Sequence, residues 1–296
     1  MNYQPLVTVN ILSFNRIDEL RNTLTKVYEQ DYKNIEVIVV DNASSDGSSE
    51  MVNNEFPSVQ LIQMEKNIGI AGWNEGFKVA KGGYVLVLDD DAYPDKNSII
   101  LSLQEFQNDI EIACITFNLI DINSGDFFVN NWLPSDKNKK TYWPVFVGCA
   151  FIVKKNRLPE TFIFPDEYFV YQHELPMAAE IYLINKKIAF IPSIIGYHNF
   201  KSNQEYKIFN DRMIFRNTLM YIVDYIPYSL WMFYYFQIIV FYLLRSIRHK
   251  WLLSYLEVVI STCPIKFRSK LDLRYFLFLR SKRIFNFSLL AKLPNL

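Results

Sequence analysis

The chain has few cysteines, and they are scattered. Three of its 296 residues are cysteine, namely Cys114, Cys149 and Cys263. They are too few and too far apart for a disulfide framework or a zinc site, so a reducing compartment is expected. The amino terminus enters a strand-like pattern at once and has no charged segment followed by an apolar signal core. The folded body of the chain is therefore expected in the cytoplasm.

The chain also lacks net charge, because 31 Lys and Arg balance 31 Asp and Glu. Overall charge thus gives no argument for a nucleic-acid partner, and none is expected. The cations are unevenly distributed, however, with ten Lys or Arg against two acids between Arg245 and Arg283. The sequence shows no internal repeat and no low-complexity tract. A basic, apolar tail therefore follows a more acidic body.

Strand and helix signals alternate through the first hundred residues. The apolar periodicity predicts strands over 7–13, 35–41, 59–64 and 84–88, alternating with helices over 18–29 and 71–80. Asp18 is expected to cap the first helix, and Ser44 or Ser45 the helix after the second strand. This is the pattern of a doubly wound α/β domain with a mostly parallel sheet. Beyond Ala113 strands and turns replace it.

The most informative run, Tyr84 to Asp91, is an apolar strand that ends in three adjacent carboxylates. The strand is expected to be buried on both faces, which puts Asp89, Asp90 and Asp91 at its carboxyl end, where open α/β sheets bind ligands. Neighbouring carboxylates repel one another, and a bound divalent cation lets all of them stay ionised. Oxygen ligands favour Mg²⁺ or Mn²⁺, and Mg²⁺ commonly shares substrate phosphates. The run therefore predicts a metal-bound diphosphate.

A second predicted strand also ends in an acid, Asp41, followed by a polar turn. A carboxylate here can accept hydrogen bonds from the ring N–H of a pyrimidine or from ribose hydroxyls, while a plain helix cap and turn is the alternative. The glycines of the segment 67–76 allow backbone to approach a ligand closely, with tight packing as the alternative. Their spacing matches neither a dinucleotide fingerprint nor a phosphate-binding P-loop.

Four motifs together resemble the family 2 glycosyltransferases of the GT-A fold, especially bacterial rhamnosyltransferase-like members. They are Val9–Arg16, Val40–Gly47, Asn67–Gly69 and Asp89–Asp91, and their order and spacing match over roughly residues 7 to 220. The resemblance implies that Asp41 contacts the nucleotide base and that Asp89 and Asp91 hold ribose and metal. The nucleotide-binding residues that it implies are Ser13, Asn15, Asp41, Asn67, Asn74, Asp89 and Asp90.

An inverting transfer needs a base near the acceptor hydroxyl. The segment 168–175 resembles the family segment in which an aromatic strand ends in a Glu-Asp pair, but this chain has His173 and Glu174 there. Glu174 is the candidate catalytic base, and a helix-start carboxylate that stabilises the helix dipole is the alternative. His173 is placed on the acceptor side or orients Glu174. Gly148 and Cys149 resemble the segment that lines the acceptor side, with an ordinary buried strand as the alternative.

His198 follows a strand-like run over 191–197. A neutral imidazole there can complete a metal shell, and in related enzymes a histidine at the matching place binds metal or diphosphate. The predicted metal ligands are therefore Asp89, Asp91 and His198, for Mn²⁺ or Mg²⁺. A structural histidine is the alternative.

The final third contains nineteen consecutive residues without a charge, 226–244. As a helix they would measure about 28 Å, close to the hydrocarbon thickness of a bilayer. Their aromatic residues suit the membrane interface, and Arg245, Arg248 and Lys250 suit anionic headgroups. We expect 226–283 to attach, as a peripheral or monotopic segment, to the cytoplasmic face of the cell membrane. A buried helical layer or a homo-oligomer interface is the alternative.

These observations predict a GT-A domain over 1–220, with a nucleotide-sugar half (1–100) and an acceptor half (101–220), and a helical membrane-associating region over 221–296. The expected enzyme is an inverting, metal-dependent glycosyltransferase that moves a sugar from a UDP- or dTDP-sugar to a hydroxyl of a lipid-linked surface polysaccharide. One alternative is another nucleotide-sugar enzyme, such as a pyrophosphorylase, although the basic glycine-rich loop that would favour it is absent. The other is a non-catalytic membrane scaffold that binds nucleotide sugars.

Overall fold

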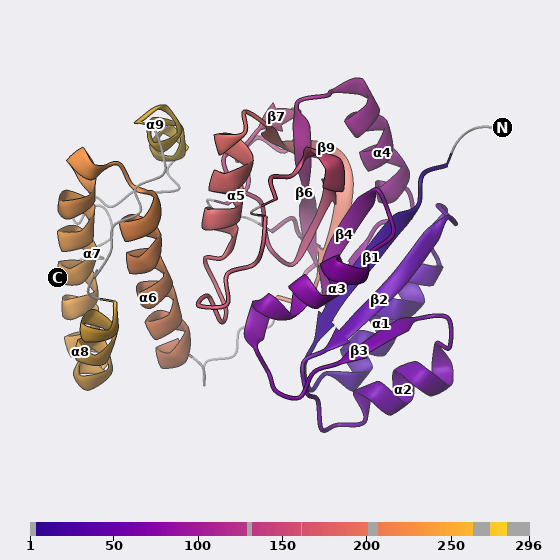
Figure 1. Ribbon diagram of the computed structural model, residues 1–296, viewed down its shortest axis with the longest axis horizontal. Coiled ribbons are helices and arrows are strands. Elements are labelled where there is room, and N and C mark those ends of the chain that lie inside the picture. The colour runs from indigo at the N-terminus through magenta and orange to yellow at the C-terminus, as the bar shows by residue number, and fades with distance from the viewer. Residues whose placement is uncertain (1–3, 129–131, 161, 201–206, 263–272, 283–296) are drawn as a thin grey trace. The chain divides into compact units, whose positions relative to one another are not determined.

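The structure is a computed structural model that describes residues 4–128, 132–160, 162–200, 207–262 and 273–282 (Figure 1). The chain forms two compact units. The α/β unit consists of Met1–Phe169 and Glu180–Lys201, and the helical unit consists of Val170–Ala179 and Ser202–Leu296. The residues predicted to be functional are therefore divided between two units.

A mixed sheet forms the centre of the α/β unit. Within the described residues its strand order is β3-β2-β1-β4-β8-β6-β9-β5, with β7 paired to β9. The strands are β1 (Val7–Ser13), β2 (Ile35–Asp41), β3 (Gln60–Gln63), β4 (Tyr84–Asp89), β5 (Ala92–Pro94), β6 (Ile112–Asp121), β7 (Thr141–Tyr142), β8 (Ala150–Lys154) and β9 (Lys187–His198). Strands β1 to β4 pair in parallel, whereas β8 pairs antiparallel to β4 and β6, and β5 antiparallel to β9. The prediction of a mostly parallel sheet is thus correct for strands β1 to β4, in the first half of the unit.

Helices cover both faces of the parallel strands. The helices of the α/β unit are α1 (Ile17–Tyr28), α2 (Ser48–Glu55), α3 (Trp73–Val79) and α4 (Ser98–Asn108), with short 3₁₀ turns η1 (Gly69–Gly72) and η2 (Lys155–Arg157). Val9 and Ile11 of β1 share one hydrophobic core with Leu24 of α1. On the opposite face the Asn10 side chain donates a hydrogen bond to the Trp73 carbonyl in α3, at 2.9 Å. Figure 1 shows α1 and α3 on opposite sides of the sheet, which is the doubly wound arrangement.

Asp46 caps two helices, which corrects two predictions. Helix α1 begins at Ile17, whose N–H donates to Asp46 Oδ2 at 2.9 Å, so Asp18 lies inside the first turn instead of capping it. Helix α2 begins at Ser48, whose N–H donates to Asp46 Oδ1 at 3.1 Å. The predicted caps Ser44 and Ser45 are therefore wrong. A single carboxylate satisfies free N–H groups at both helix starts, which ties the loops after β1 and β2 together.

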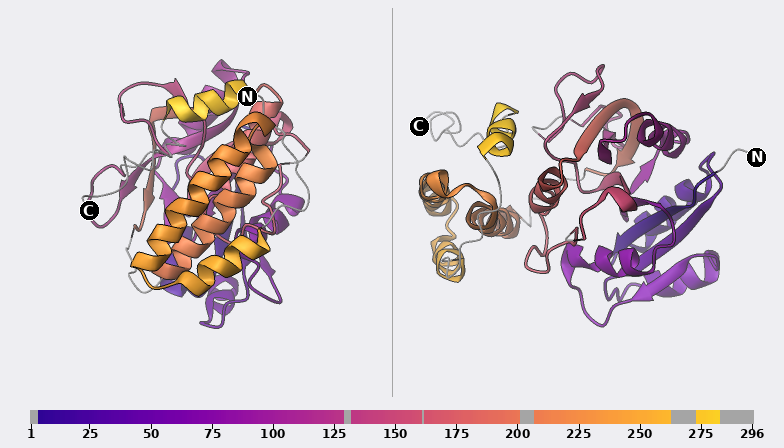
Figure 2. Two further views of the ribbon diagram at one scale, coloured as in Figure 1. Left: turned by 90° about the vertical axis from the view of Figure 1, so that its left-hand side faces the viewer. Right: turned by 45° about the horizontal axis from the view of Figure 1, so that its top comes forward.

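The helical unit is built on aromatic packing. Its helices are α6 (Lys207–Tyr225), α7 (Tyr228–Arg248), α8 (Leu252–Ser261) and α9 (Leu273–Ser281), together with the start of α5 (Glu174–Leu183). The Phe215 ring of α6 stacks on Tyr242 of α7 and on Tyr255 of α8. Arg245 of α7 makes a two-pronged ion pair with Asp211 of α6, each N–O distance being 2.7 Å. These contacts join α6, α7 and α8 side by side (Figure 2).

The unit boundaries differ from the predicted domain boundary. The sequence placed residues up to 220 with the α/β domain, whereas the structure groups the whole of α6 with the C-terminal helices. The contacts of Phe215 and Asp211 explain this grouping, because both residues face α7. The strand predictions over 7–13 and 35–41 match β1 and β2 to the residue.

Replacing Gly76 by Ala is expected to lower the free energy of unfolding by about 1–3 kcal/mol, the usual cost of overpacking a core. A Cβ at this position would overlap the buried Asn10 side chain, which is held by its bond to α3. Urea denaturation measures the loss. Gly83→Ala is the matched control, because its Cβ would meet no atom within 4 Å. Equal stability of the two variants would contradict the close approach of α3 to β1.

Candidate functional site

The candidate site lies at the carboxyl ends of β1 and β4. From β1 the strand order runs to β2 and β3 on one side, and the chain then returns to add β4 on the other side. Ligands bind at such a reversal of strand order in open α/β sheets. Here β1 ends at Ser13 and continues into Arg16, while β4 ends at Asp89 and continues into Asp91.

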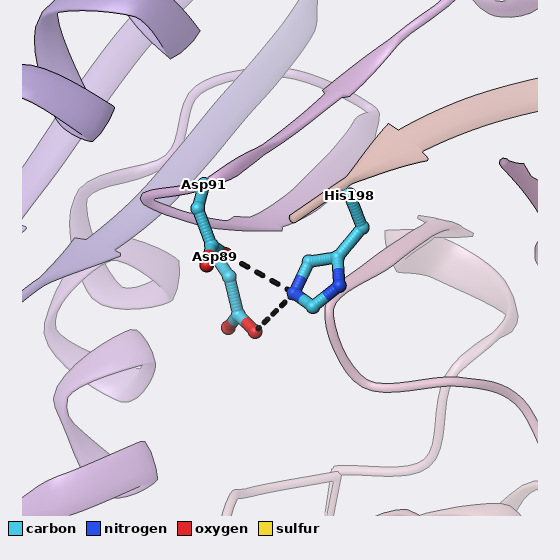
Figure 3. A group of neighbouring side chains, drawn as sticks. All are labelled: Asp89, Asp91 and His198. Carbon is cyan, nitrogen blue, oxygen red and sulfur yellow. Dashed lines mark ion pairs between the residues drawn. The ribbon is translucent and has the colours of Figure 1, made fainter. Parts of the chain in front are cut away.

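Asp89, Asp91 and His198 come together at this edge, as predicted (Figure 3). His198 Nε2 lies 3.1 Å from Asp91 Oδ1 and 3.8 Å from Asp89 Oδ2. The short strand β5 brings the histidine here, because Ala92, directly after Asp91, pairs with His198 at the end of β9. Residues more than a hundred positions apart thus meet through one strand pair.

The three side chains fit a divalent cation. Each offers one ligand atom, and these atoms all lie within 4.8 Å of one another. Carboxylate oxygens and an imidazole nitrogen are together a donor set for a divalent first-row metal such as Mn²⁺. The Asp89 side chain is 38% exposed, whereas that of Asp91 is 6% exposed. A metal held here would therefore have one solvent-facing side for the oxygens of a ligand. The choice between Mn²⁺ and Mg²⁺ stays a prediction.

Arg16 reaches the same carboxylates from β1. Its Nη1 lies 2.5 Å from Asp91 Oδ2 and 3.2 Å from Asp90 Oδ1. Burial alone would lower the pKa of Arg16, but the charges of Asp90 and Asp91 outweigh it and hold that pKa above its ordinary value. Arg16 is the functional residue that sequence reasoning missed at this site. Its position three residues after a strand end was the available signal.

Asp90 faces β1 and has a raised pKa. Burial raises the pKa of Asp90 to about 7, and the charge of Arg16 opposes that shift. Its Oδ2 accepts a hydrogen bond from the Phe14 N–H at 3.2 Å, and its carbonyl accepts one from the Thr23 hydroxyl at 2.8 Å. The carboxylate therefore joins the β4 end to the loop after β1. Its predicted contact with nucleotide stays a prediction.

Asp91 and His198 shift each other's pKa. Burial would raise the pKa of Asp91, but the hydrogen bond and charge of His198, with the charge of Arg16, lower it. The pKa of His198 is raised because the same carboxylate outweighs the effect of burial. A metal binds the neutral imidazole and the ionised carboxylate, so metal binding at this site is expected to depend on pH.

The loops after β1 and β2 are fastened to each other. The Asn15 N–H donates to the Ser44 hydroxyl at 2.9 Å, and Asn15 Oδ1 accepts from the Ser45 N–H at 2.7 Å. Asp41 accepts from the Ser44 N–H at 2.9 Å and from the Ser49 hydroxyl. The Ser13 hydroxyl is buried and has no hydrogen-bond partner among the described residues. The base and ribose contacts assigned to Ser13, Asn15 and Asp41 stay predictions.

Asn42 was also missed by sequence reasoning. It is buried, its Nδ2 donates to Asn67 Oδ1 at 2.9 Å, and its Oδ1 accepts from the Ile68 N–H at 3.0 Å. Asn74 is held differently, because both ends of its amide pair with the Phe164 backbone, at 2.8 and 2.9 Å. The two predicted residues Asn67 and Asn74 line one cavity of about 660 Å³. Their roles in nucleotide binding stay predictions.

The predicted acceptor-side residues of the α/β unit lie next to Asp89. The Asp89 N–H donates to the Cys149 carbonyl at 3.0 Å, and Cys149 is buried at the start of β8. Gly148 precedes it. Cys149 therefore contributes its backbone to the placement of Asp89. Contact of either residue with an acceptor stays a prediction.

Glu174, the predicted base, belongs to the helical unit and begins α5. Its Oε2 lies 3.6 Å from Nδ1 of the buried His173. Burial lowers the pKa of His173, and the charge of Glu174 opposes this shift. Tyr171 and Gln172, the two residues before His173, have positive φ angles of 67° and 62°. Such backbone strain in residues other than glycine gathers at functional sites.

Asn217 of α6 holds this strained segment. It is fully buried, and its Nδ2 donates to the carbonyls of Val170 and Tyr171 at 2.8 and 2.7 Å. Sequence reasoning missed Asn217. A polar residue whose neighbours three and four positions away are apolar was the signal, but its partner could not be read from the sequence.

Part of the chain is similar in sequence to known proteins. The chain is 30% identical over 118 residues to poly-beta-1,6-N-acetyl-D-glucosamine synthase from Staphylococcus aureus strain MSSA476, which covers 38% of this chain and 28% of that protein. It is 28% identical over 148 residues to hyaluronan synthase from Pasteurella multocida, which covers 48% of this chain and 15% of that protein. The matched part is less than a third of the length of either relative.

Two solved structures have a similar fold. The mannosyltransferase PcManGT from Pyrobaculum calidifontis, in complex with GDP-Man and Mn²⁺, has a TM-score of 0.60 at 18% identity, covering 96% of this chain and 81% of that one. S. aureus TarS 1-349, in complex with UDP, has a TM-score of 0.57 at 16% identity, covering 86% and 90%. The predicted GT-A fold, with a helical C-terminal region, is confirmed.

The sequence profile described as Glycosyl transferase family 2 matches residues 8–171. This range is more than half of the chain, and it contains Asp41, Asn67 and the three consecutive carboxylates from Asp89 to Asp91. The rhamnosyltransferase-like subgroup stays a prediction. The chain belongs to glycosyl transferase family 2.

Proposed function

We propose that this protein is an inverting, metal-dependent glycosyltransferase that takes its sugar from a nucleoside diphosphate donor. The main support for this proposal is that Asp89, Asp91 and His198 come together where the strand order of the sheet reverses, in a chain that belongs to glycosyl transferase family 2. A divalent cation bound there would neutralise the charge that develops on the leaving diphosphate. Asp89 and Asp91 would hold that cation, with His198 as the third ligand.

The donor is proposed to be a UDP- or dTDP-sugar. Asp41 lies at the end of β2, next to β1, and its carboxylate is oriented by Ser44 and Ser49. A fixed carboxylate can accept the ring N–H of uracil or thymine, and the two bases present nearly the same edge. The fold relatives were solved with UDP, UDP-GlcNAc and GDP-Man, which supports a nucleoside diphosphate sugar as the class of donor.

Glu174 is proposed to take the proton from the acceptor hydroxyl as the new glycosidic bond forms. Its side chain is 13% exposed, and the residue starts helix α5, separated by His173 from the strained pair Tyr171 and Gln172. The two hydrogen bonds from Asn217 support this strained backbone, so the carboxylate is presented by a rigid segment. Rigid placement of a base is what catalysis of proton transfer requires.

The acceptor is proposed to be a hydroxyl of a surface polysaccharide carried on a lipid. The curated relatives are named as synthases of poly-beta-1,6-N-acetyl-D-glucosamine, hyaluronan and chondroitin, which supports a glycan as the acceptor. A lipid carrier follows from the proposed membrane attachment, because docking at a bilayer raises the local concentration of a lipid-linked acceptor.

Membrane attachment is proposed to occur through the outer face of α7. The inner face is buried at four-residue spacing through Tyr234, Ile238, Tyr242 and Ser246. The outer face exposes large apolar side chains: Met232, Phe233, Phe236, Leu244 and Ile247. Among them Phe236 is 68% exposed and Ile247 is 58% exposed. Helix α7 is long and apolar enough to cross a membrane by length and composition.

Helix α8 has the same pattern over a shorter length. Tyr255 and Val258 are buried, whereas Leu253, Leu256 and Ile260 are exposed at helical spacing. Ten residues make a helix of about 15 Å, too short to span a bilayer. Because α7 and α8 both present an apolar face while charged α6 packs against them, attachment in the plane of the membrane is favoured over a crossing. Figure 2 (left) shows α7 and α8 together.

Cations border these apolar faces. Arg248, the last residue of α7, and Lys250, in the turn before α8, are exposed and suit anionic headgroups. Arg245 was predicted to share that role, but the structure commits it to Asp211. Residues 263–272 and residue 283 of the proposed attachment segment lie outside the described residues.

Asp91→Ala is expected to abolish metal-dependent nucleotide binding, because it removes the buried metal ligand. Titration calorimetry with UDP, dTDP and GDP, with and without Mn²⁺, tests this on the full chain. At a hundredfold excess over Kd, binding should stabilise the wild type by about 2.7 kcal/mol. Asp18→Ala, an exposed acid of α1, is the control and should bind as the wild type does. Failure of the wild type to bind any diphosphate would overturn the donor assignment.

Glu174→Gln is expected to lower kcat by about 10²-fold or more and to leave the Kd for the nucleoside diphosphate within about twofold. The amide keeps the shape of the side chain and removes its basicity. Sugar transfer from the donor selected by calorimetry to a glycan acceptor is measured, together with glycan assembly in cells. Unchanged transfer by the variant would exclude Glu174 as the base. Nucleotide binding with no transfer and no effect of the variant on assembly would instead support a non-catalytic scaffold.

Replacing Phe236 and Ile247 together by Ser is expected to weaken partitioning onto phosphatidylglycerol vesicles by about tenfold or more, since each loses about 1 kcal/mol or more of apolar burial. Co-sedimentation with vesicles of varied phosphatidylglycerol content measures this. Ile110→Ser, at an isolated side chain that is 72% exposed in the α/β unit, is the matched control. Equal sedimentation of both variants would place the attachment elsewhere.

A further inference from the structure

We propose that Arg16 is a built-in counter-ion of the metal-binding carboxylates, which makes binding of the divalent metal depend on the nucleoside diphosphate. The inference rests on the proposed function, because it concerns the same cation and the same donor. It goes beyond that function in two ways. The Arg16 guanidinium is assigned as the cation that balances the carboxylates before ligands bind, and the binding of metal and the binding of nucleotide are predicted to strengthen each other.

The geometry places one guanidinium nitrogen where it competes with a metal. Arg16 Nη1 contacts Asp91 at 2.5 Å and Asp90 at 3.2 Å, and both carboxylates are almost completely buried. Asp91 therefore has Arg16 on Oδ2 and His198 on Oδ1. A divalent cation that binds Asp91 would lie close to a fixed positive charge. Like charges a few ångströms apart repel each other appreciably even near a protein surface.

Arg16 is also suited to bind a diphosphate, and by doing so it would free these carboxylates for the metal. Its side chain is 50% exposed, so the guanidinium lies at the open side of the site. Within the described residues its Nε and Nη2 groups donate no hydrogen bond, which leaves them for phosphate oxygens. Arg pairs with phosphate at least as well as with carboxylate, through two parallel hydrogen bonds. A diphosphate would thus attract Arg16 and add negative charge to the metal site at the same time.

The expected consequence is positive coupling between the two ligands. Metal alone must overcome the charge of Arg16, and diphosphate alone must approach three carboxylates. When both bind, each cancels the charge that opposes the other. Such a coupling is reciprocal, so the factor by which UDP tightens Mn²⁺ binding equals the factor by which Mn²⁺ tightens UDP binding.

A structural role for Arg16 predicts a different result. Arg16 precedes the first residue of α1, and its ion pairs join β1 to β4. If Arg16 merely held these elements in place, its removal would weaken the binding of metal and nucleotide together. The counter-ion role predicts opposite signs, namely tighter binding of metal alone and weaker binding of nucleotide.

The test measures Mn²⁺ binding directly, from the electron paramagnetic resonance signal of free Mn²⁺, with the full chain and with UDP, dTDP or GDP absent or present. For Arg16→Gln we expect binding of Mn²⁺ alone to become about tenfold tighter or more, and the enhancement by diphosphate to fall to less than about threefold. Arg16→Lys keeps a cation and should bind Mn²⁺ alone within about threefold of the wild type. Arg21→Gln removes an exposed arginine of α1 and should match the wild type.

Mn²⁺ binding alone that is no tighter in Arg16→Gln than in the wild type, with both proteins folded by circular dichroism, would overturn the proposal. Equal Mn²⁺ affinity of the wild type with and without a diphosphate that binds would also overturn it. Failure of every diphosphate to bind the wild type is a different result. It would refute the donor assignment, while the comparison of Mn²⁺ alone would still test the competition between Arg16 and metal.

Discussion

The repulsion among three consecutive carboxylates is the constraint on which the site of this protein depends. Asp89, Asp90 and Asp91 follow one buried strand, and each neighbouring element supplies a compensating group. The loop after β1 provides the Phe14 N–H and the Arg16 guanidinium, and β9 provides the imidazole of His198. These groups meet because β1 is the sheet neighbour of β4, and because β5, directly after β4, pairs with the end of β9.

Strained backbone occurs where the candidate site is built. Among the described residues other than glycine, positive φ angles are found at Asn15, Ala43, Tyr171, Gln172, Asn185 and Lys250. The first four lie in the loops after β1 and β2 and directly before His173. Two of these loops are fastened by side chains that were not part of the predicted site, Ser44 for Asn15 and Asn217 for Tyr171. Strain of this kind persists when surrounding hydrogen bonds over-determine the conformation.

The sequence predicted those features that depend on short-range patterns, namely the strands and the polar residues at their ends. The runs at β1 and β2 were placed to the residue, and the acidic end of β4 and the histidine at the end of β9 were predicted to share one metal site, where the structure brings them together. It failed where a side chain acts on a distant segment. Asp46 caps two helices, Asn42 orders the loop at Asn67, and Arg245 pairs with Asp211 instead of remaining available to lipid. The pairs Asp46–Ile17, Asn42–Asn67 and Arg245–Asp211 are each more than twenty residues apart, so local propensity carries no signal of them.

Helix α7 shows how far such pattern reasoning extends. Its sequence is uncharged up to Leu244 and predominantly apolar, which is typical of a helix that is buried in protein or in membrane. The structure answers this question for one face of the helix, because Tyr234, Ile238 and Tyr242 are buried inside the helical unit. The opposite half, with Phe236 and Ile247, is as apolar and has no such cover among the described residues. The two faces differ in what they contact and not in their polarity. A face of this kind is stable where its surroundings are apolar, and this requirement links the helical unit to the proposed lipid-linked acceptor.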